Sequence, residues 1–422
     1  MVAGVAFGLL AAAAGWHGFV GDWVKPFGTI FINLLKLIAV PLIVASLISG
    51  VANLRDLSDL SAMGGRTIGL YLASTVLAVT IGLVTVNLVS PGKLISAETR
   101  EDLMAEYAGE ATARQSAAAQ QRDAGPLQAL VDIVPDNIVG AAGSNRNMLQ
   151  VIFFVLFFGV GLILVDPARA APVKAFFDGV NDVILKLVDL IMLAAPLGVF
   201  ALLAALVVES PSADLFYALL GYGACVIAGL AVLIFLVYPT LVRVFAGLSY
   251  RRFFEGMGPA QLLAFSTSSS AATLPVTMER VNEHIGVREE VSSFVLPIGA
   301  TINMDGTSLY QAVAAVFIAQ AFGMDLTLAQ QLGIVATATL ASIGSAAVPG
   351  AGMVMLVIVL AQAGIPEAGI ALIFAVDRPL DMCRTVANVT GDATVATLIA
   401  RSLGKLGVPM PKDWDDNLEA VR

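Results

Sequence analysis

Charged and polar residues recur at helical spacing in an otherwise apolar stretch near the end of the chain. Within "DRPLDMCRTVANVTGD", residues 377–392, Asp377 is followed after 4, 7, 11 and 15 positions by Asp381, Arg384, Asn388 and Asp392. We call these five residues the polar stripe, because these intervals place them on one face of an α-helix. A charge at the centre of a bilayer costs about 2.5–3.5 kcal/mol, so four unpaired charges would cost on the order of 10 kcal/mol. In a membrane, the stripe therefore needs partners, water or ions.

A structural ion-pair network is one interpretation of the polar stripe. Asp381 would then pair with Arg384, and Asp377 with Arg378 or Arg384, and these pairs would hold neighbouring helices together. The charges do not balance, however, because Asp305 adds another acid and Asp392 has no basic neighbour in the sequence. We therefore expect a cation that the chain itself does not supply.

Sodium suits such a site because it is a hard ion that prefers oxygen ligands. "NMDGT", residues 303–307, offers Asn303, Asp305 and Thr307 around Gly306, where a broken helix would release backbone carbonyls. The whole chain has only two histidines and two cysteines, so zinc and copper are poor candidates.

Two further segments combine small residues with a proline. "TSSSAATLP", residues 267–275, supplies hydroxyls and, at a hairpin tip, backbone N–H groups that suit an anionic group. Its alternative is a serine-rich contact between helices. "VPGAG", residues 348–352, is typical of a movable flap, and its alternative is an ordinary re-entrant turn. The order and spacing of these segments relative to the stripe favour a binding site.

The composition indicates which elements must position these residues. With 58% hydrophobic and 13% charged residues, and a mean hydropathy of +0.86, the sequence predicts a polytopic membrane protein. The net charge of −9 argues against nucleic-acid binding. The six apolar spans expected before residue 250 cover residues 2–16, 27–53, 63–90, 147–166, 174–208 and 214–247. Basic residues follow the even-numbered spans, which predicts that the loops after those spans are cytoplasmic. The polar loop at 93–123 follows the third span, so it is expected to be external.

After residue 250 the apolar segments are interrupted in a repeated pattern. We expect a hairpin at 254–281 followed by a span at 287–322, then a hairpin at 329–363 followed by a span at 366–404. Repeated interrupted segments are typical of transporters whose binding site lies at the membrane midplane. The transport core would cover 251–405 with help from the third span, a scaffold would cover 1–250, and a cytoplasmic tail 406–422.

Two other function classes fit less well. Asp305 and Asp392, each beside a glycine, could form an intramembrane aspartyl protease pair, but Arg384 and Asn388 would then have no role. A channel is disfavoured because such a charged, enclosed site should trap ions. We therefore expect a transporter without catalytic residues or a bound cofactor.

The sequence closely resembles the glutamate transporter homologues, the dicarboxylate/amino acid:cation symporters. The resemblance runs from "FINLLKLIAVPLIVASLISGV" at 31–51 through "NMLQVIFFVLFFG" at 147–159 to "NMDGT", "VPGAG" and "RTVANVTGD". It implies an all-α fold with about eight transmembrane helices, two re-entrant helical hairpins, inverted repeats and an elevator mechanism. It also implies a homotrimer in the cell inner membrane, with both termini cytoplasmic.

The resemblance further implies sodium-coupled symport of aspartate or glutamate; the alternative is a proton- or sodium-coupled C4-dicarboxylate carrier. Asp381 would hold the substrate amino group, and Arg384 would grip its side-chain carboxylate with two donors that a lysine cannot reproduce. The implied substrate-binding residues are Ser269, Ser270, Thr307, Val348, Pro349, Gly350, Ala351, Gly352, Asp381, Arg384, Thr385 and Asn388. The implied sodium-binding residues are Tyr71, Ser74, Thr75, Gly299, Thr301, Asn303, Met304, Asp305, Ser342, Ile343, Asn388 and Asp392.

Some positions depart from the family pattern. Relatives often carry an arginine either in the first hairpin or just after the position of Asp381. In this chain these two positions are Ser268 and Met382. Our hypothesis is that Arg378, beside Asp377, supplies that balancing charge; the alternative is that Arg378 only extends to the membrane interface. Ala347 replaces a glycine common in the second hairpin, which predicts a stiffer flap.

Overall fold

The computed structural model describes residues 2–52, 61–97, 99–100, 134–143, 147–209, 213–343 and 350–410. Within these ranges the chain is helical and contains no β-strand, apart from an isolated antiparallel bridge between Val287 and Leu406. This confirms the predicted all-α class. Most of the predicted external loop at 93–123, most of the tail at 406–422, and Val348 and Pro349 lie outside the described residues.

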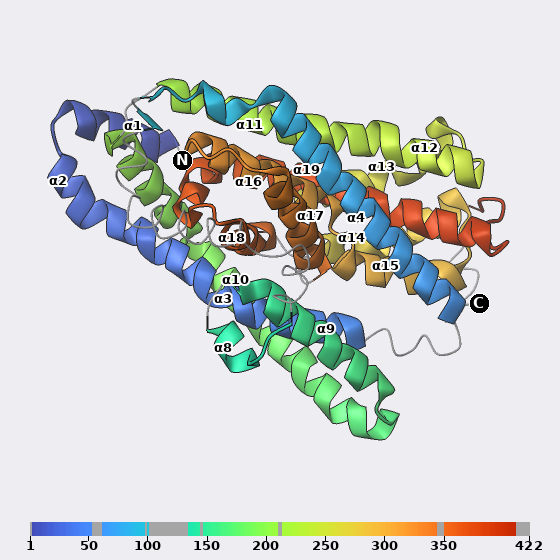
Figure 1. Cartoon of the computed structure of the whole chain (residues 1–422). Helices are drawn as coiled ribbons and strands as arrows, with labels where there is room; N and C mark the ends of the chain where they lie inside the picture. Colours follow the sequence, from blue (N-terminus) through green and yellow to red (C-terminus); the bar gives the residue numbers. More distant parts are fainter. Residues whose placement is uncertain are drawn as a thin grey trace, which may run out of the picture.

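The first half combines long apolar helices with short helical turns. They are α1 (Val2–Ala13), α2 (His17–Phe19), the π-helix η1 (Val20–Val24), α3 (Lys25–Ala52), α4 (Ser61–Val89), the 3-10 helix η3 (Pro91–Leu94), α8 (Ile138–Ala142), α9 (Met148–Leu164) and α10 (Pro167–Glu209). Helix α10 packs along α3 and α1, and α9 packs on α3. In Figure 1, α3, α9 and α10 form a long diagonal group along one side of the molecule, whereas α4 crosses the helices of the second half.

The second half consists of shorter helices interrupted at their middles. They are α11 (Ala213–Ala231), η5 (Val232–Val237), α12 (Tyr238–Leu241), η6 (Val242–Ala246), α13 (Tyr250–Thr267), α14 (Ser270–Glu279), η7 (Arg280–Ile285), α15 (Glu289–Ile302), α16 (Asp305–Ala321), α17 (Leu328–Ile343), α18 (Ala351–Ala363), η8 (Glu367–Gly369) and α19 (Ile370–Ser402). Here η5, η6 and η7 are π-helices, and η8 is a 3-10 helix.

Apolar side chains cover both the core and much of the outer surface. Every residue of α16 is buried, as is α18 from Ala351 to Ala361. In contrast, Leu88, Leu164 and Leu193 are 77–80% exposed on the outside of α4, α9 and α10. Within the described residues, three helical segments are long and apolar enough to cross a membrane, namely His17–Ala45, Met63–Leu94 and Asp214–Ala246. Outward leucines on such segments are the pattern expected where lipid replaces water.

Two chain breaks bring backbone groups into the interior. Between α15 and α16, Asn303 and Met304 leave the helical conformation, with ψ values of 87° and 52°. Between α13 and α14, Ser268 adopts a left-handed conformation with φ of 52°. Helix α16 packs against α19, and α13, α14 and α15 also contact α19. The polar stripe therefore meets the interrupted segments in the middle of the molecule (Figure 1).

Candidate functional site

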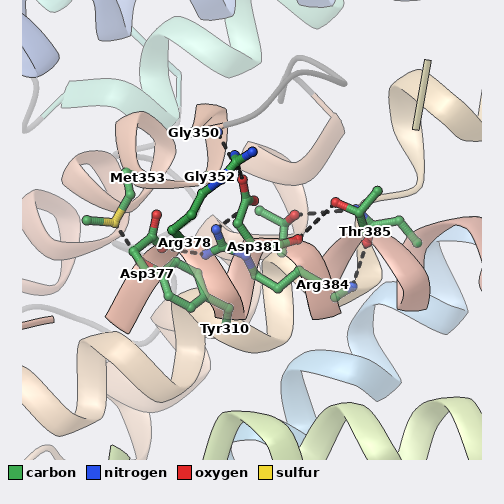
Figure 2. A network of polar contacts seen from close by, with 12 residues as sticks. Tyr310, Gly350, Gly352, Met353, Asp377, Arg378, Asp381, Arg384 and Thr385 are labelled. Atoms are coloured by element: carbon green, nitrogen blue, oxygen red, sulfur yellow. Dashed lines mark hydrogen bonds and ion pairs between the residues drawn. The ribbon is translucent and has the colours of Figure 1, made fainter. Parts of the chain in front are cut away.

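The buried guanidinium of Arg384 lies between two carboxylates of its own helix (Figure 2). Its Nη2 donates to Asp381 Oδ1 at 2.7 Å, and its Nη1 lies 3.1 Å from Asp377 Oδ1. The second approach is an ion pair without a hydrogen bond, since neither of its two atoms has a hydrogen-bond partner among the described residues. The ring of Tyr310 covers the guanidinium, with its centroid 3.8 Å from Cζ. This is a cation–π contact in a site closed to water.

Arg384 has unused hydrogen-bonding capacity. Both Nε and Nη1 are buried and, within the described part of the chain, have no hydrogen-bond partner. Buried donors of a charged group are strongly favoured to find acceptors, because leaving them unpaired costs free energy. The arrangement therefore suits an additional anionic acceptor beside Asp381.

The start of α18 covers this arginine. Gly350 has a positive φ of 81°, and its N–H donates to Asp381 Oδ2 at 3.2 Å. A Cβ atom at Gly352 would lie 3.1 Å from Thr307 Cγ2 and 3.6 Å from Arg384 Cζ, so a larger residue here would press on the side chain of Thr307. Ala351 is buried beside them. The structure thus brings the described part of the second flap onto the polar stripe, as Figure 2 shows.

Asn388 joins the stripe to the break before α16. Its Oδ1 accepts from Gly306 N at 2.8 Å, while its Nδ2 faces Met304 Sδ at 3.2 Å and Thr307 Oγ1 at 3.5 Å. Thr385 donates to Asp381 O of its own helix at 2.9 Å. Thr307, Asn388 and Thr385 are buried close to Arg384, so these predicted substrate residues do gather in one place.

The predicted tip of the first hairpin is the turn between α13 and α14. Ser269 caps α14 by accepting from Ala272 N at 3.2 Å, and Ser269 and Ser270 are both buried. Helix α14 packs against α19.

A second polar cluster surrounds Asp305 and is built from four helical segments. Asp305 Oδ1 accepts from Thr75 at 2.7 Å and from Ser74 at 3.3 Å, and Oδ2 accepts from Tyr238 at 2.8 Å. Asn303 accepts from Ser74 at 3.2 Å and donates to Asp392 Oδ1 at 2.9 Å. Both carboxylates are buried, and no basic side chain forms an ion pair with either one within the described residues. We call Ser74, Thr75, Asn303, Asp305 and Asp392 the oxygen cluster.

Tyr71 lies beside the oxygen cluster and donates to the backbone. Its hydroxyl bonds to Val295 O at 2.9 Å, not to a carboxylate. A Cβ atom at Gly299 would lie 2.4 Å from this hydroxyl oxygen and 2.5 Å from Asp392 Oδ1. Only glycine therefore fits at 299, where these two oxygens converge.

The residues predicted for a third ion are less closely associated. Thr301 is exposed, and its hydroxyl bonds to Ile298 O at 3.0 Å and Pro297 O at 3.2 Å in its own helix. Ser342 is buried and donates to Thr339 O at 2.8 Å, while Ile343 ends α17. The carbonyl of Met304 accepts from Ser308 N at 2.8 Å. Helices α15 and α17 contact each other.

Arg378 lies at the edge of the stripe. Its Nη1 is 3.7 Å from Asp381 Oδ2, and its side chain is 54% exposed. At this distance and exposure the pair is weak and screened by salt. The proximity to Asp381 and the exposure of Arg378 fit either interpretation, so the role of Arg378 stays a hypothesis.

Sequence reasoning missed two contacts. Tyr310 follows Thr307 by three positions, so helical spacing could have placed it on the same face. Tyr238 lies in an apolar span far from any quoted motif, and nothing in its surroundings signals the hydrogen bond to Asp305.

Known proteins are similar in sequence to this chain over nearly its full length. The family described as the Sodium:dicarboxylate symporter family matches residues 1–402. A proton/sodium-glutamate symport protein of Bacillus subtilis (strain 168) is 34% identical, over 95% of this chain and 90% of that protein. Excitatory amino acid transporter 3 of Mus musculus is 37% identical over 90% of this chain and 79% of its own length. A C4-dicarboxylate transport protein of Paracoccus denitrificans (strain Pd 1222) is 33% identical, over 92% of this chain and 82% of that protein.

These matches confirm the resemblance read from the motifs, and the apolar helices agree with an integral membrane protein. The chain belongs to the sodium:dicarboxylate symporter family.

Proposed function

We propose that this protein is a secondary active symporter that binds an acidic amino acid, aspartate or glutamate, and couples its entry to sodium ions. The observation that carries the proposal is the fully buried Arg384, whose Nε and Nη1 lack hydrogen-bond partners among the described residues. A substrate carboxylate would supply the missing acceptors in a charge-assisted pair. The names of the relatives, glutamate symport proteins among them, support this substrate class.

Asp381 would take the amino group of the substrate. Its Oδ1 is held by Arg384, and its Oδ2 accepts from Gly350 N at 3.2 Å and lies 3.7 Å from Arg378 Nη1. An ammonium group at hydrogen-bond distance would be a stronger partner for Oδ2. Thr307, Thr385 and Asn388 would line the pocket beneath the flap. Ser269, Ser270 and the backbone from Val348 to Gly352 would close it from the two hairpins.

The oxygen cluster would hold sodium. Its donors are hydroxyl, amide and carboxylate oxygens, which are the ligands that hard cations prefer. Asp305 and Asp392 need positive charge, and each sodium ion would supply one. We assign one ion to Gly299, Asn303, Asn388 and Asp392, a second to Tyr71, Ser74, Thr75, Asn303 and Asp305, and a third to backbone oxygens near Thr301, Met304, Ser342 and Ile343.

The two sites would be coupled through Asn388 and the break before α16. Asn388 contacts both Gly306 N and Thr307, and Asn303 on the other side of the break contacts Asp392. Ordering of this break by sodium would therefore fix the substrate pocket. Since coupling is reciprocal, substrate would raise sodium affinity by the same factor.

The larger architecture remains part of the proposal. We propose about eight transmembrane helices and two re-entrant hairpins, with residues 251–405 and the third span moving as an elevator against the scaffold at 1–250. The protein would be a trimer of the cell inner membrane with both termini in the cytoplasm. The family assignment and the buried interrupted helices support this arrangement.

Transport of a C4-dicarboxylate is the second candidate function. Arg384 and Arg378 both lie near Asp381, at 2.7 Å and 3.7 Å, so its charge is already offset without a substrate amine. A relative named C4-dicarboxylate transport protein is 33% identical.

Calorimetric binding of aspartate, glutamate and succinate to the purified protein, at high and zero sodium, separates these functions. We expect aspartate or glutamate to bind only with sodium, and succinate to bind far more weakly. Uptake into liposomes with and without a sodium gradient provides the transport readout. Equal affinity for aspartate and glutamate at high and at zero sodium would refute the proposal. Tighter binding of succinate than of the amino acids would favour the dicarboxylate carrier.

A further inference from the structure

A cavity of about 320 Å³ lies far from the polar stripe, and neither the polar stripe nor the oxygen cluster uses it. It is formed where η3, after the end of α4, meets the turn that follows α16. Helix α16 has 17 residues, so at about 1.5 Å per residue this end lies about 24 Å from Asp305. Its volume is in the range of pockets that hold small organic ligands.

Three charged side chains line this cavity, which we call the rim cavity: Lys93, Arg100 and Asp325. Among the described residues, no ion pair engages any of them. Lys93 and Asp325 are exposed and Arg100 is half-buried, so two positive groups and one negative group border the same space without an ion pair among them. A ligand that fits them carries two negative groups and one positive group.

Arg100 is held in place but keeps a donor unused. Its Nη2 donates to Ile95 O at 3.3 Å, and its Cδ would lie 2.9 Å from a Cβ atom at Gly323, so the side chain packs against the turn. Its Nε is buried without a hydrogen-bond partner within the described residues. A buried guanidinium donor without an acceptor is costly, and an anionic ligand would remove that cost.

Gln320 adds a neutral contact with a fixed orientation. It is 8% exposed, and its Oε1 accepts from Gly92 N at 3.1 Å. Because the oxygen is held by the backbone of η3, the amide nitrogen is the group left to serve as donor at the cavity it lines.

We propose that the rim cavity is a second, low-affinity binding site for an acidic amino acid. Lys93 and Arg100 would hold the two carboxylates, Asp325 the ammonium group, and Gln320 would donate to one carboxylate. The choice of an acidic amino acid as the ligand rests on the function proposed above. The charged residues that line the cavity are observed independently of that proposal. No residue of the oxygen cluster lies here, so binding at this site should not require sodium.

The experiment uses ligand-observed NMR on the full-length protein in nanodiscs of neutral phosphatidylcholine, without sodium. The Arg384→Lys variant serves as background, because it should disable the stripe site while keeping its charge. We expect saturable millimolar binding of L-aspartate to this background. Adding Lys93→Gln and Arg100→Gln should weaken it at least tenfold. Arg401→Gln, an exposed arginine at the other end of the molecule, is the matched control and should change nothing.

Asp325→Asn tests the ammonium contact. Aspartate should bind the Arg384→Lys background more tightly than succinate, and Asp325→Asn should abolish that preference. Sodium-dependent binding to the Lys93→Gln/Arg100→Gln protein with Arg384 intact shows that these changes leave the fold unharmed.

Three results would overturn the proposal: no saturable aspartate binding to the Arg384→Lys background, binding unchanged by loss of Lys93 and Arg100, or displacement of aspartate by phosphatidylglycerol in the disc. The last would make the cavity a lipid headgroup site. Failure of the proposed function has a different signature, since the unsubstituted protein would then lack sodium-dependent binding.

Discussion

The hydroxyl of Tyr238 donates to Asp305 Oδ2 at 2.8 Å, although the two residues belong to different helices and lie 67 positions apart. Thr75 and Ser74 hold the other oxygen of the same carboxylate. Tyr238 therefore fixes the direction in which Asp305 presents its remaining lone pairs. It is a positioning residue for the proposed sodium site.

Tyr238→Phe should lower sodium affinity about tenfold or more, since a hydrogen bond to a charged group contributes about 1.5–3 kcal/mol. Substrate affinity at saturating sodium should change little. Tyr217→Phe is the matched control, because the side chain of Tyr217 is 64% exposed. Sodium titration of aspartate binding measures both. Equal effects of the two substitutions would remove Tyr238 from the site.

Arg384→Lys should weaken binding of acidic substrates by at least about a hundredfold while the protein still folds. Lysine retains the charge that Asp377 and Asp381 require, but it lacks the planar set of donors that binds a carboxylate at two points. Arg288→Lys is the control, because Arg288 is an exposed arginine paired with Glu290 at 3.9 Å. Calorimetry with aspartate reports the difference, and unchanged aspartate affinity would contradict the pocket assignment.

Arg378→Ala should change substrate affinity by no more than about fivefold, because a half-exposed ion pair contributes about 0.2–1 kcal/mol. The effect should shrink as salt is added and should be restored by Arg378→Lys. Binding and coupled uptake measured at two ionic strengths test this. If affinity and coupling stay the same in Arg378→Ala, the residue extends to the interface without balancing Asp381.

Asp392→Asn should reduce the sodium dependence of binding, with a lower Hill coefficient and at least about tenfold weaker sodium affinity. The asparagine still offers an oxygen to Asn303 Nδ2, so the packing survives while the charge that holds the cation is lost. Asp166→Asn, at the exposed start of α10, is the control. A sodium titration identical to that of the unsubstituted protein would place the ion elsewhere.

The apolar composition and the positions of the interrupted segments were enough to predict a helical membrane protein with a polar centre. The reason is local: helical periodicity alone puts Asp377, Asp381, Arg384 and Asn388 on one face, whatever surrounds them. The same rule could have added Tyr310. The cost of burying charge then predicted that this face must find partners, and the structure shows carboxylates and N–H groups around it.

The assembly of the oxygen cluster is different, because its members come from separate helices. Only the resemblance to the family pointed to Ser74 and Thr75, which in an apolar span would be expected to bond to their own helix. The structure shows that both do bond to Tyr71 O and also reach Asp305.

What the sequence determined by itself was which side chains share a face, because that depends on a repeat of a few residues. What only the tertiary structure decided was which faces meet: Tyr238 with Asp305, Tyr71 with Val295 O, and Arg100 with the turn after α16. Those contacts depend on how helices far apart in the chain pack and rotate against each other. Neither hydropathy nor the spacing of residues within one helix determines how that helix is rotated against its neighbours.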